Sequence, residues 1–352
     1  MSAGWRKDLT ENLVTLEELA EKFSFDSDSL QAVSAKYPFR LTRHYFDLIQ
    51  QVNDPLWRQV VPAQEELLDN TQLPDPLNEA GLSPVPGLIH RYPDRVVWLV
   101  SNECAVYCRF CMRKRTVGCG SGSCQQPQLA DVLAYLAATP SIRDVILSGG
   151  DPLLLDDELL ETILASLKQI PHIEIIRIGT RIPITFPQRI TSSFAAMLKR
   201  YQPLYINTHF NHPREINGAS SAACTLLADA GIPLGNQTVL LKGVNDDPAI
   251  MQALNRCLLQ LRVKPYYLHQ MDLVKGTSHV RTSVKSGLEI MASLRGHCSG
   301  LAVPYYVIDL PEGKGKVPVL PESVRREGER FVITTYTGDE VAYDDPGGGH
   351  EQ

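Results

Sequence analysis

Apolar and polar residues follow two different patterns along this chain, and the change between them comes near residue 90. Before that point, apolar side chains such as Leu13, Leu16 and Leu19 recur near helical spacing. Several prolines between residues 74 and 86 then favour extended backbone. We therefore expect a helical N-terminal region that ends in an extended arm.

Beyond residue 90, short β-branched runs alternate with longer amphipathic segments. The predicted strands are Val96–Val100, Asp144–Leu147, Glu174–Ile178, Leu204–Asn207, Gln237–Leu241 and Pro265–Leu268. The predicted helices lie near 128–138, 157–169, 188–201, 218–230, 247–261 and 283–295. Helices between successive strands imply right-handed crossovers and a parallel sheet. Six such units predict an α/β fold built as an incomplete barrel, and a doubly wound open sheet is the alternative that the pattern leaves open.

The C-terminal part adds a further apolar run, Tyr305–Asp309, which precedes a loop containing glycine and lysine. Residues Phe331–Tyr336 predict a terminal hairpin strand. We divide the chain into an N-terminal helical region and arm at 1–90, a partial barrel at 91–310 and a C-terminal segment at 311–352.

The bulk composition excludes several classes of protein. A net charge of −6, with no long basic run, gives no electrostatic footprint for nucleic acid or an anionic membrane. No apolar stretch approaches the ~18 residues of a spanning helix, and the polar N-terminus does not resemble a secretory signal. We expect a cytoplasmic protein, in which clustered cysteines indicate metal binding or catalysis.

Three cysteines form the strongest chemical signal in the sequence. Cys104, Cys108 and Cys111 directly follow the first predicted barrel strand, in the pattern CxxxCxxC. Three thiolates on one short loop can hold three irons of a [4Fe–4S] cluster and leave the fourth iron open, whereas the usual site has four cysteine ligands. The alternatives are a zinc site, which normally pairs two-cysteine knuckles, or a set of buried thiols. Cys119 and Cys124 follow in a Gly- and Ser-rich stretch and are interpreted as bystanders.

The cysteine pattern resembles the signature of the radical S-adenosylmethionine (SAM) superfamily, in which the open iron chelates SAM. The second predicted strand ends in Ser148, Gly149, Gly150 and Asp151, which resembles the Gly-Gly-Glu/Asp element of that superfamily. The resemblance implies that this element contacts the methionine amino group. Taken alone, the same residues would predict only a turn.

The resemblance narrows to the lysine 2,3-aminomutase family over roughly residues 80 to 340, through several short matches in one order. They are Pro86–Arg95, Cys104–Arg115, Ser148–Leu153, Asn207–Pro213, Asn236–Gln237, Leu240–Asp246, Tyr266–Asp272, Leu294–Gly300 and Asp309–Pro318. Family members also use pyridoxal 5′-phosphate (PLP), bound by a lysine in a glycine-rich segment. The matching position is Lys316 in Pro311–Lys316, with Lys314 as a competitor and a solvated loop lysine as the alternative.

Further site residues follow from the resemblance. Arg91 and Arg95 match arginines near the PLP phosphate, and an arginine fork suits phosphate geometry. Arg113 matches the arginine that holds the substrate α-carboxylate. His209 and Gln237 match positions near SAM and PLP, with roles left open.

Substrate identity depends on two carboxylates. Asp272 and Asp309 match the pair that binds the ε-ammonium group of lysine in the family, and relatives that act on glutamate replace them. Two buried acids repel each other, and an ammonium group between them removes that conflict. The resemblance therefore implies conversion of L-lysine to β-lysine (3,6-diaminohexanoate) by a 1,2-amino shift.

Several alternatives stay open at this stage. They are the same reaction serving elongation factor P modification, a sister aminomutase for arginine or glutamate, a radical SAM enzyme without PLP, and a metal protein without catalytic activity. The implied partners are lysine and an electron donor such as flavodoxin or ferredoxin, and a homo-oligomer is left open. Because no cysteine follows Cys298, we expect no structural zinc. His269 stands where larger relatives have tyrosine, so the packing near the cofactor can differ.

Overall fold

The computed structural model describes residues 3–25, 27–69, 72–118, 128–327 and 330–344. Cys119 and Cys124, interpreted above as bystanders, lie outside these ranges. Within them, no helix combines the length and the apolar character that a membrane crossing requires.

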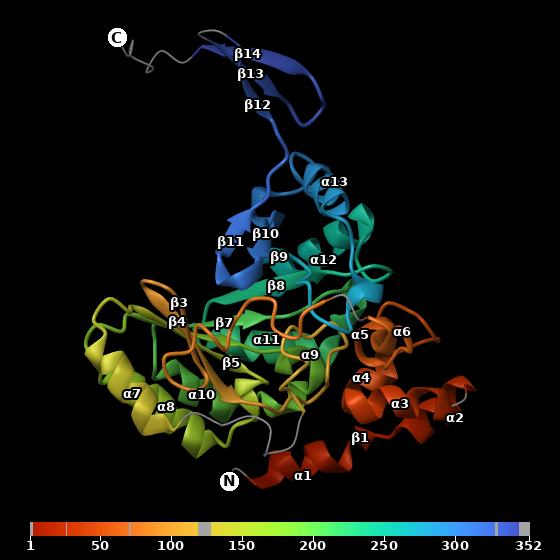
Figure 1. Ribbon diagram of the computed structural model, residues 1–352, viewed down its shortest axis with the longest axis vertical. Helices are drawn as coiled ribbons and strands as arrows, with labels where there is room; N and C mark the ends of the chain where they lie inside the picture. The colour runs from red at the N-terminus through yellow and green to blue at the C-terminus, as the bar shows by residue number, and fades with distance from the viewer. Residues whose placement is uncertain (1–2, 26, 70–71, 119–127, 328–329, 345–352) are drawn as a thin grey trace.

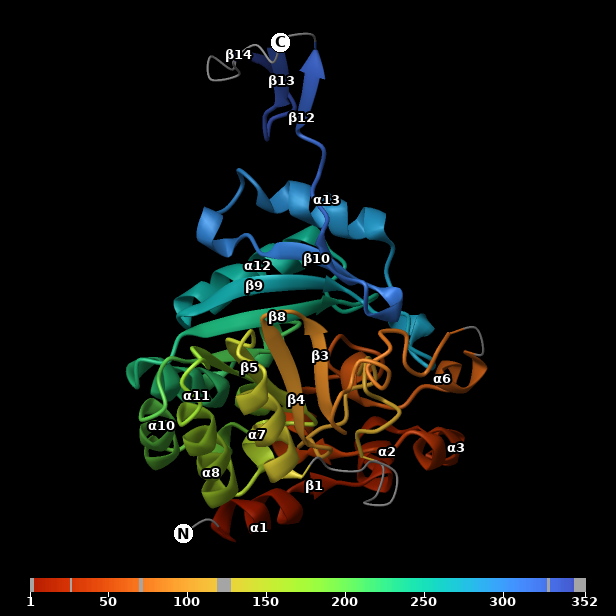
Figure 2. The same ribbon diagram turned by 60° about the vertical axis from the view of Figure 1, so that its left-hand side comes forward.

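A nine-stranded sheet forms the centre of the fold, with its strands in chain order from β3 to β11 (Figures 1 and 2). Its strands are β3 (Leu88–Tyr92), β4 (Arg95–Ser101), β5 (Asp144–Gly149), β6 (Ile175–Gly179), β7 (Leu204–Thr208), β8 (Leu234–Leu240), β9 (Val263–Gln270), β10 (Tyr305–Leu310) and β11 (Gly315–Pro318). Strands β4 to β10 are parallel, and β3 and β11 are antiparallel to their neighbours at the two edges.

The strand order distinguishes between the two predicted architectures. A doubly wound sheet reverses its order at a switch point, whereas a barrel adds each new strand beside the last. Here every strand of the sheet lies beside its predecessor, and the edge strands β3 and β11 do not pair with each other. The predicted partial α/β barrel is therefore confirmed, and the run at Tyr305–Asp309 adds a seventh parallel strand to the six that the pattern predicted.

Helices follow the parallel strands and cover the outer face of the sheet (Figure 1). They are α7 (Leu129–Ala138), α8 (Asp157–Lys168), α9 (Ile182–Thr185), α10 (Ser192–Lys199), α11 (Gly218–Asp229), α12 (Pro248–Gln260) and α13 (Val284–Leu294). The helix predicted near 188–201 begins later, because the Thr191 hydroxyl accepts the Phe194 N–H and caps α10. Alternate strand residues such as Val145, Leu147 and Ile178 are fully buried in the core.

The N-terminal helices lie below the barrel and along one side of it, and a small sheet stands apart at the upper end of the view (Figures 1 and 2). The N-terminal elements are α1 (Ala3–Glu11), β1 (Leu13–Val14), α2 (Leu16–Phe23), α3 (Asp28–Lys36), β2 (Leu41–Thr42), α4 (Arg43–Leu48), α5 (Trp57–Val60) and α6 (Glu65–Leu68). The small sheet consists of β12 (Val324–Glu327), β13 (Arg330–Thr334) and β14 (Glu340–Asp344). The strand predicted at Phe331–Tyr336 is thus the middle strand of three, and the segment predicted at 311–352 contributes to two different sheets.

Candidate functional site

The polar residues singled out in the sequence gather where the parallel strands end. In a barrel built from parallel strands, the loops at the carboxyl ends of the strands form the site. The cysteine loop follows β4, Asp151 follows β5, His209 follows β7 and Asp272 follows β9. Asp309 lies near the end of β10.

The three cysteines lie on a loop that is tied to the N-terminal region by its backbone. The N–H groups of Tyr107 and Arg109 donate to the carbonyls of Arg40 (3.0 Å) and Gln59 (2.8 Å). Cys104, Cys108 and Cys111 are free thiols and are half-buried. The N-terminal helices therefore fix the course of this loop.

The electrostatics of the cysteines fit a positively charged iron–sulfur centre. Burial raises the pKa of Cys104 well above its ordinary value, and Asp151 and the other two cysteines add to this shift. Burial and the nearby Cys108 raise the pKa of Cys111 to about 11. Thiolates in such a place need a cationic partner, and metal ligation deprotonates a thiol outright.

A buried carboxylate, which sequence reasoning missed, clamps the cysteine loop. Glu66 is fully buried and forms ion pairs with Arg109 and Lys114, which come from the loop itself. Lys114 also donates to the carbonyl of Gly276 at 3.0 Å. Burial and the neighbouring Arg109 lower the pKa of Lys114 to about 8. Glu66 was not predicted because its partners lie more than 40 residues away along the chain.

The Gly149–Gly150 pair lets the end of β5 approach the cysteine loop closely. Gly149 has a φ of +114°, and a Cβ on Gly150 would lie 2.3 Å from the Glu103 carbonyl oxygen. The following residue, Asp151, accepts hydrogen bonds from the Thr180 hydroxyl and from the backbone N–H of Arg181, each at 2.7 Å. The carboxylate thus joins the ends of β5 and β6, and its contact with SAM stays a prediction.

Lys316 enters the site through a hairpin. Strands β10 and β11 pair so that Lys316 lies directly opposite Asp309, and the Lys316 ammonium forms an ion pair with that carboxylate. Its Nζ lies 3.3 Å from Nδ1 of His269, and its backbone N–H donates to the Tyr92 hydroxyl at 2.7 Å. Lys314 instead pairs with Glu312 and is 68% exposed, so the structure separates the two candidate lysines.

The two arginines predicted for the PLP phosphate occupy different environments. Arg91 is largely buried and donates to Asp309 at 2.9 Å, which places it in the cluster around Lys316. Arg95 pairs with its neighbour Asp94 and stacks 3.9 Å from the ring centroid of Tyr92. Their assignment to a phosphate stays a prediction.

Arg113 is held by a second carboxylate that sequence reasoning missed. Glu79 is 4% exposed. Its carboxylate accepts hydrogen bonds from the guanidinium groups of Arg113, at 2.8 Å, and of Arg115, at 3.0 Å. Arg113 also donates to the Ser148 hydroxyl at 3.1 Å. The fork of Arg113 is therefore fixed between the arm and the end of β5.

The pKa values of the two aspartates of the predicted ammonium site are shifted in opposite directions. Burial and repulsion by Asp309 raise the pKa of Asp272 to about 7. Burial alone would raise the pKa of Asp309, but His269 and the Lys316 ammonium hold it well below its ordinary value. Burial and repulsion by Lys316 lower the pKa of His269 to about 4, so its imidazole is neutral near pH 7. Lys316 and Arg91 offset the shift of the Asp272 pKa only in part, so Asp272 is the weaker acid of the pair.

Electrostatic interactions connect the cysteine loop with the lysine hairpin. Arg113 interacts with both Cys111 and Asp272, and Asp272 in turn interacts with Asp309 and Lys316. These interactions place Cys111, Arg113, Asp272, Asp309 and Lys316 near one another.

The remaining predicted residues, His209 and Gln237, also lie in this region of the sheet. Burial lowers the pKa of His209 well below its ordinary value, and its ring packs edge-on against Phe110 at 5.5 Å. Its Nε2 is a buried atom with no hydrogen-bond partner among the described residues, as expected where a further group binds. Gln237 lies in β8, opposite Tyr267 in β9.

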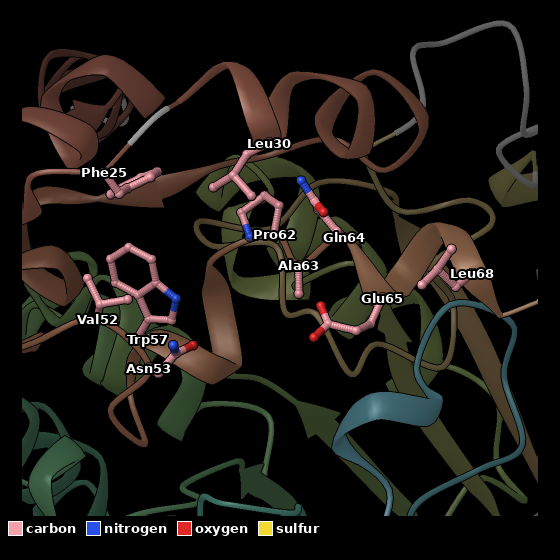
Figure 3. Close-up of a pocket in the computed structure, with 10 residues that line it drawn as sticks. All are labelled: Phe25, Leu30, Val52, Asn53, Trp57, Pro62, Ala63, Gln64, Glu65 and Leu68. Carbon is pink, nitrogen blue, oxygen red and sulfur yellow. The ribbon is translucent and has the colours of Figure 1, made fainter.

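A separate hollow lies among the N-terminal helices (Figure 3). Its lining consists mainly of apolar side chains from different helices and loops, including Phe25, Leu30, Trp57 and Pro62. None of the predicted site residues lines it. We therefore assign the chemistry to the carboxyl ends of the barrel strands.

Comparisons with known proteins show the family to which the chain belongs. Residues 98–253 match the model of the radical SAM superfamily, and residues 291–350 match a model described as lysine-2,3-aminomutase. An L-lysine 2,3-aminomutase of Methanococcus maripaludis is 48% identical over 91% of this chain and 75% of that protein. The L-lysine 2,3-aminomutase of Clostridium subterminale is 45% identical over 97% of this chain and 84% of its own. A glutamate 2,3-aminomutase of Clostridioides difficile is 43% identical over 94% of this chain and 79% of its own.

The matches cover the barrel, the cysteine loop and the lysine hairpin together, and they confirm the family predicted from the sequence. This chain belongs to the lysine 2,3-aminomutase family of radical SAM enzymes.

Proposed function

We propose that this protein converts L-lysine to β-lysine by a 1,2-amino shift with no net redox change. The observation that carries the proposal is the pair of carboxylates, Asp272 and Asp309, beside Lys316 at the ends of β9 and β10. Such a pair matches a substrate with a second ammonium group.

The carboxylates favour lysine over glutamate on electrostatic grounds. Asp272 holds a pKa of about 7 because it is buried beside another acid, and an ammonium group between the two removes that repulsion. A glutamate side chain would bring a third carboxylate to the same place, and like charges at close range cost several kcal/mol. Arg113, fixed by Glu79, would hold the α-carboxylate at the other end of lysine.

The residues that would hold the iron–sulfur cluster and SAM lie around the cysteine loop. Cys104, Cys108 and Cys111 would bind three irons, which leaves the fourth iron for the amino and carboxylate groups of SAM. Ser148–Asp151, His209 and Gln237 would line the SAM and PLP sites. The orphaned Nε2 of His209 and the close approach of Gly150 to the loop support this assignment.

The residues that would hold PLP lie around the hairpin. Lys316 would bind the cofactor covalently, and Arg91 and Arg95 would neutralise its phosphate. Lys316 Nζ forms an ion pair with Asp309, and the neutral imidazole of His269 lies beside the same atom. When bound, the reduced cluster with SAM supplies a carbon-centred radical that takes hydrogen from the substrate, and PLP supplies the aldehyde that carries the migrating nitrogen.

The protein contributes the position of the reacting groups to this chemistry. Arg113 and the two aspartates would fix both ends of lysine, so the reacting carbon cannot rotate away from the SAM site. The clamp of Glu66 on Arg109 and Lys114 keeps the cysteine loop in place. A one-electron donor such as flavodoxin or ferredoxin would reduce the cluster.

The proposal is tested by a substrate comparison under anaerobic conditions. Reconstituted protein is incubated with SAM, PLP and dithionite and with lysine, arginine or glutamate in separate reactions, and products are measured by mass spectrometry. We expect β-lysine from lysine and no comparable product from glutamate or arginine. Faster turnover of glutamate, or lysine turnover without PLP, would contradict the proposal.

A further inference from the structure

A buried arginine beside the cysteine loop has no role in the chemistry described so far. Arg181 lies just after Thr180 in the loop that follows β6. It is 7% exposed, and its Nη1 donates to Sγ of Cys108 at 2.9 Å. Sequence reasoning missed it, because a single arginine after a strand carries no motif. Its burial against a predicted cluster ligand calls for a physical explanation.

The position of the guanidinium is fixed on several sides. Nη2 donates to Glu215 and Gln59, and Nε donates to the backbone carbonyl of His209 at 3.2 Å. The guanidinium carbon, Cζ of Arg181, lies 5.4 Å from the ring centroid of Phe110. An N–H group of Nη1 therefore stays pointed at the Cys108 sulfur, because the guanidinium cannot turn toward water.

Glu215 offsets the charge of Arg181 without depending on it. Its carboxylate also accepts from the Tyr45 hydroxyl at 2.9 Å and from the backbone N–H groups of Asn211 (2.6 Å) and His212 (3.0 Å). With three further donors, Glu215 stays hydrogen-bonded when Arg181 is replaced. A substitution at Arg181 can therefore be tested in a folded protein.

A hydrogen bond to a cluster thiolate has a predictable effect on reduction. The potential of an iron–sulfur cluster depends on its net charge, on hydrogen bonds to its sulfurs and on its exposure to solvent. Reduction adds one electron to a cluster that three thiolates already make negative, and no bond forms or breaks. A fixed donor with positive charge stabilises the reduced form more than the oxidised form, and burial strengthens this difference.

We infer that Arg181 raises the reduction potential of the cluster held by Cys104, Cys108 and Cys111 by donating a hydrogen bond to Cys108 Sγ. It thereby makes the cluster easier for a one-electron donor to reduce. The inference rests on the proposed function, because it requires the cluster. It assigns Arg181 to electron uptake and not to binding of lysine or PLP.

The test is a redox titration of the reconstituted full chain, monitored by electron paramagnetic resonance with dithionite as reductant. We expect Arg181→Gln to bind wild-type amounts of iron and to make reduction about tenfold less favourable, a fall of 59 mV for one electron. Arg181→Lys keeps the positive charge but loses the forked guanidinium, so the reduction potential of the cluster should fall by less in this variant.

Tyr45→Phe is the matched control. It removes a hydrogen bond from the same buried network but changes neither a charge nor a cysteine contact, so its potential should equal that of the wild type. An unchanged potential in Arg181→Gln, or an equal fall in Tyr45→Phe, would overturn the inference. Should Arg181→Gln bind no iron, Arg181→Lys decides the question: an unchanged potential contradicts the inference and a lowered one supports it. A wild-type protein that binds no cluster would instead refute the proposed function.

Discussion

Asp309 and Lys316 face each other across the hairpin of β10 and β11, and their side chains form an ion pair within the site. Only residues 310–315 separate them along the chain, yet their pairing depends on the hairpin register. The same carboxylate also binds Arg91 at 2.9 Å. Asp309 thus connects the predicted PLP residues with the predicted ammonium site.

Lys316→Ala should abolish β-lysine formation, because it removes the amine that would bind PLP. Iron content should stay at the wild-type value, since the Lys316 amine contacts His269 and Asp309 and, among the described residues, forms no hydrogen bond with a cysteine. Lys314→Ala is the control, because Lys314 is exposed and pairs with the exposed Glu312. The assignment is wrong if Lys314→Ala loses the absorption band of bound PLP and Lys316→Ala keeps it.

Asp309→Asn should raise the KM for lysine. Truncating one partner of a buried charge pair costs about 2 kcal/mol or more, which corresponds to roughly a thirtyfold change in affinity. Steady-state kinetics at saturating SAM and PLP measure this change. Unchanged kinetics for lysine would remove Asp309 from the specificity argument.

The KM for lysine should fall as the pH rises through 7. The pKa of Asp272 is raised to about 7 by burial and by Asp309, so this acid is neutral below that pH and ionised above it. Only the ionised form attracts the ε-ammonium group, which stays protonated because the pKa of a lysine amine is about 10.4. The measurement is KM between about pH 6 and pH 8.5, where a free acid at pKa 7 changes from mostly neutral to mostly ionised.

Asp272→Asn provides the control for this pH dependence. It should raise KM at pH 8 and flatten the profile, because the acid that titrates within this range is removed from the ammonium site. A profile in the variant that matches the wild type would show that another group titrates.

Glu79→Gln should raise the KM for lysine with a smaller effect on the rate at saturation. Glu79 fixes the fork of Arg113, and without its charge the guanidinium is free to move from the place where it would bind the α-carboxylate. Asp75→Asn removes a carboxylate that contacts Arg115 but not Arg113, and should leave KM unchanged. If both substitutions changed the KM for lysine equally, Glu79 would not be acting through the position of Arg113.

Gly150→Ala should disturb the cysteine loop. A Cβ at this position would meet the Glu103 carbonyl oxygen at 2.3 Å and its nitrogen at 2.6 Å, so backbone must move. Overpacking of this kind costs about 1–3 kcal/mol, and iron content and thermal unfolding should both fall. Gly218→Ala is the control, because its Cβ would have open space.

Local sequence patterns predicted the strands and helices of the barrel, because β-branched runs and amphipathic stretches report the burial of each element. They missed β3, which begins in the segment interpreted as an extended arm, and β11, which lies in the segment interpreted as a loop. They also missed the short β1 and β2 and two strands of the small C-terminal sheet. The candidate site came from motifs: the cysteine pattern, the glycine pair and the glycine-rich lysine segment.

The supporting residues could not be predicted in this way. Glu66, Glu79 and Arg181 act through partners that lie 34 to 73 residues away in the chain. Their roles depend on which loops the fold brings together, and no local pattern records that. The ion pair of Lys316 with Asp309 likewise required the hairpin register.

The central claim is that one site holds an open-iron cluster, SAM, PLP and lysine for an amino shift. Its most direct test is anaerobic turnover of lysine labelled with ¹⁵N at the α-amino group, followed by mass spectrometry of the product. We predict β-lysine that carries the label on C3, formed by the wild type with SAM and PLP and absent in Cys108→Ala. A protein with four irons bound that forms no labelled β-lysine, or that releases the label as ammonia, would contradict the account.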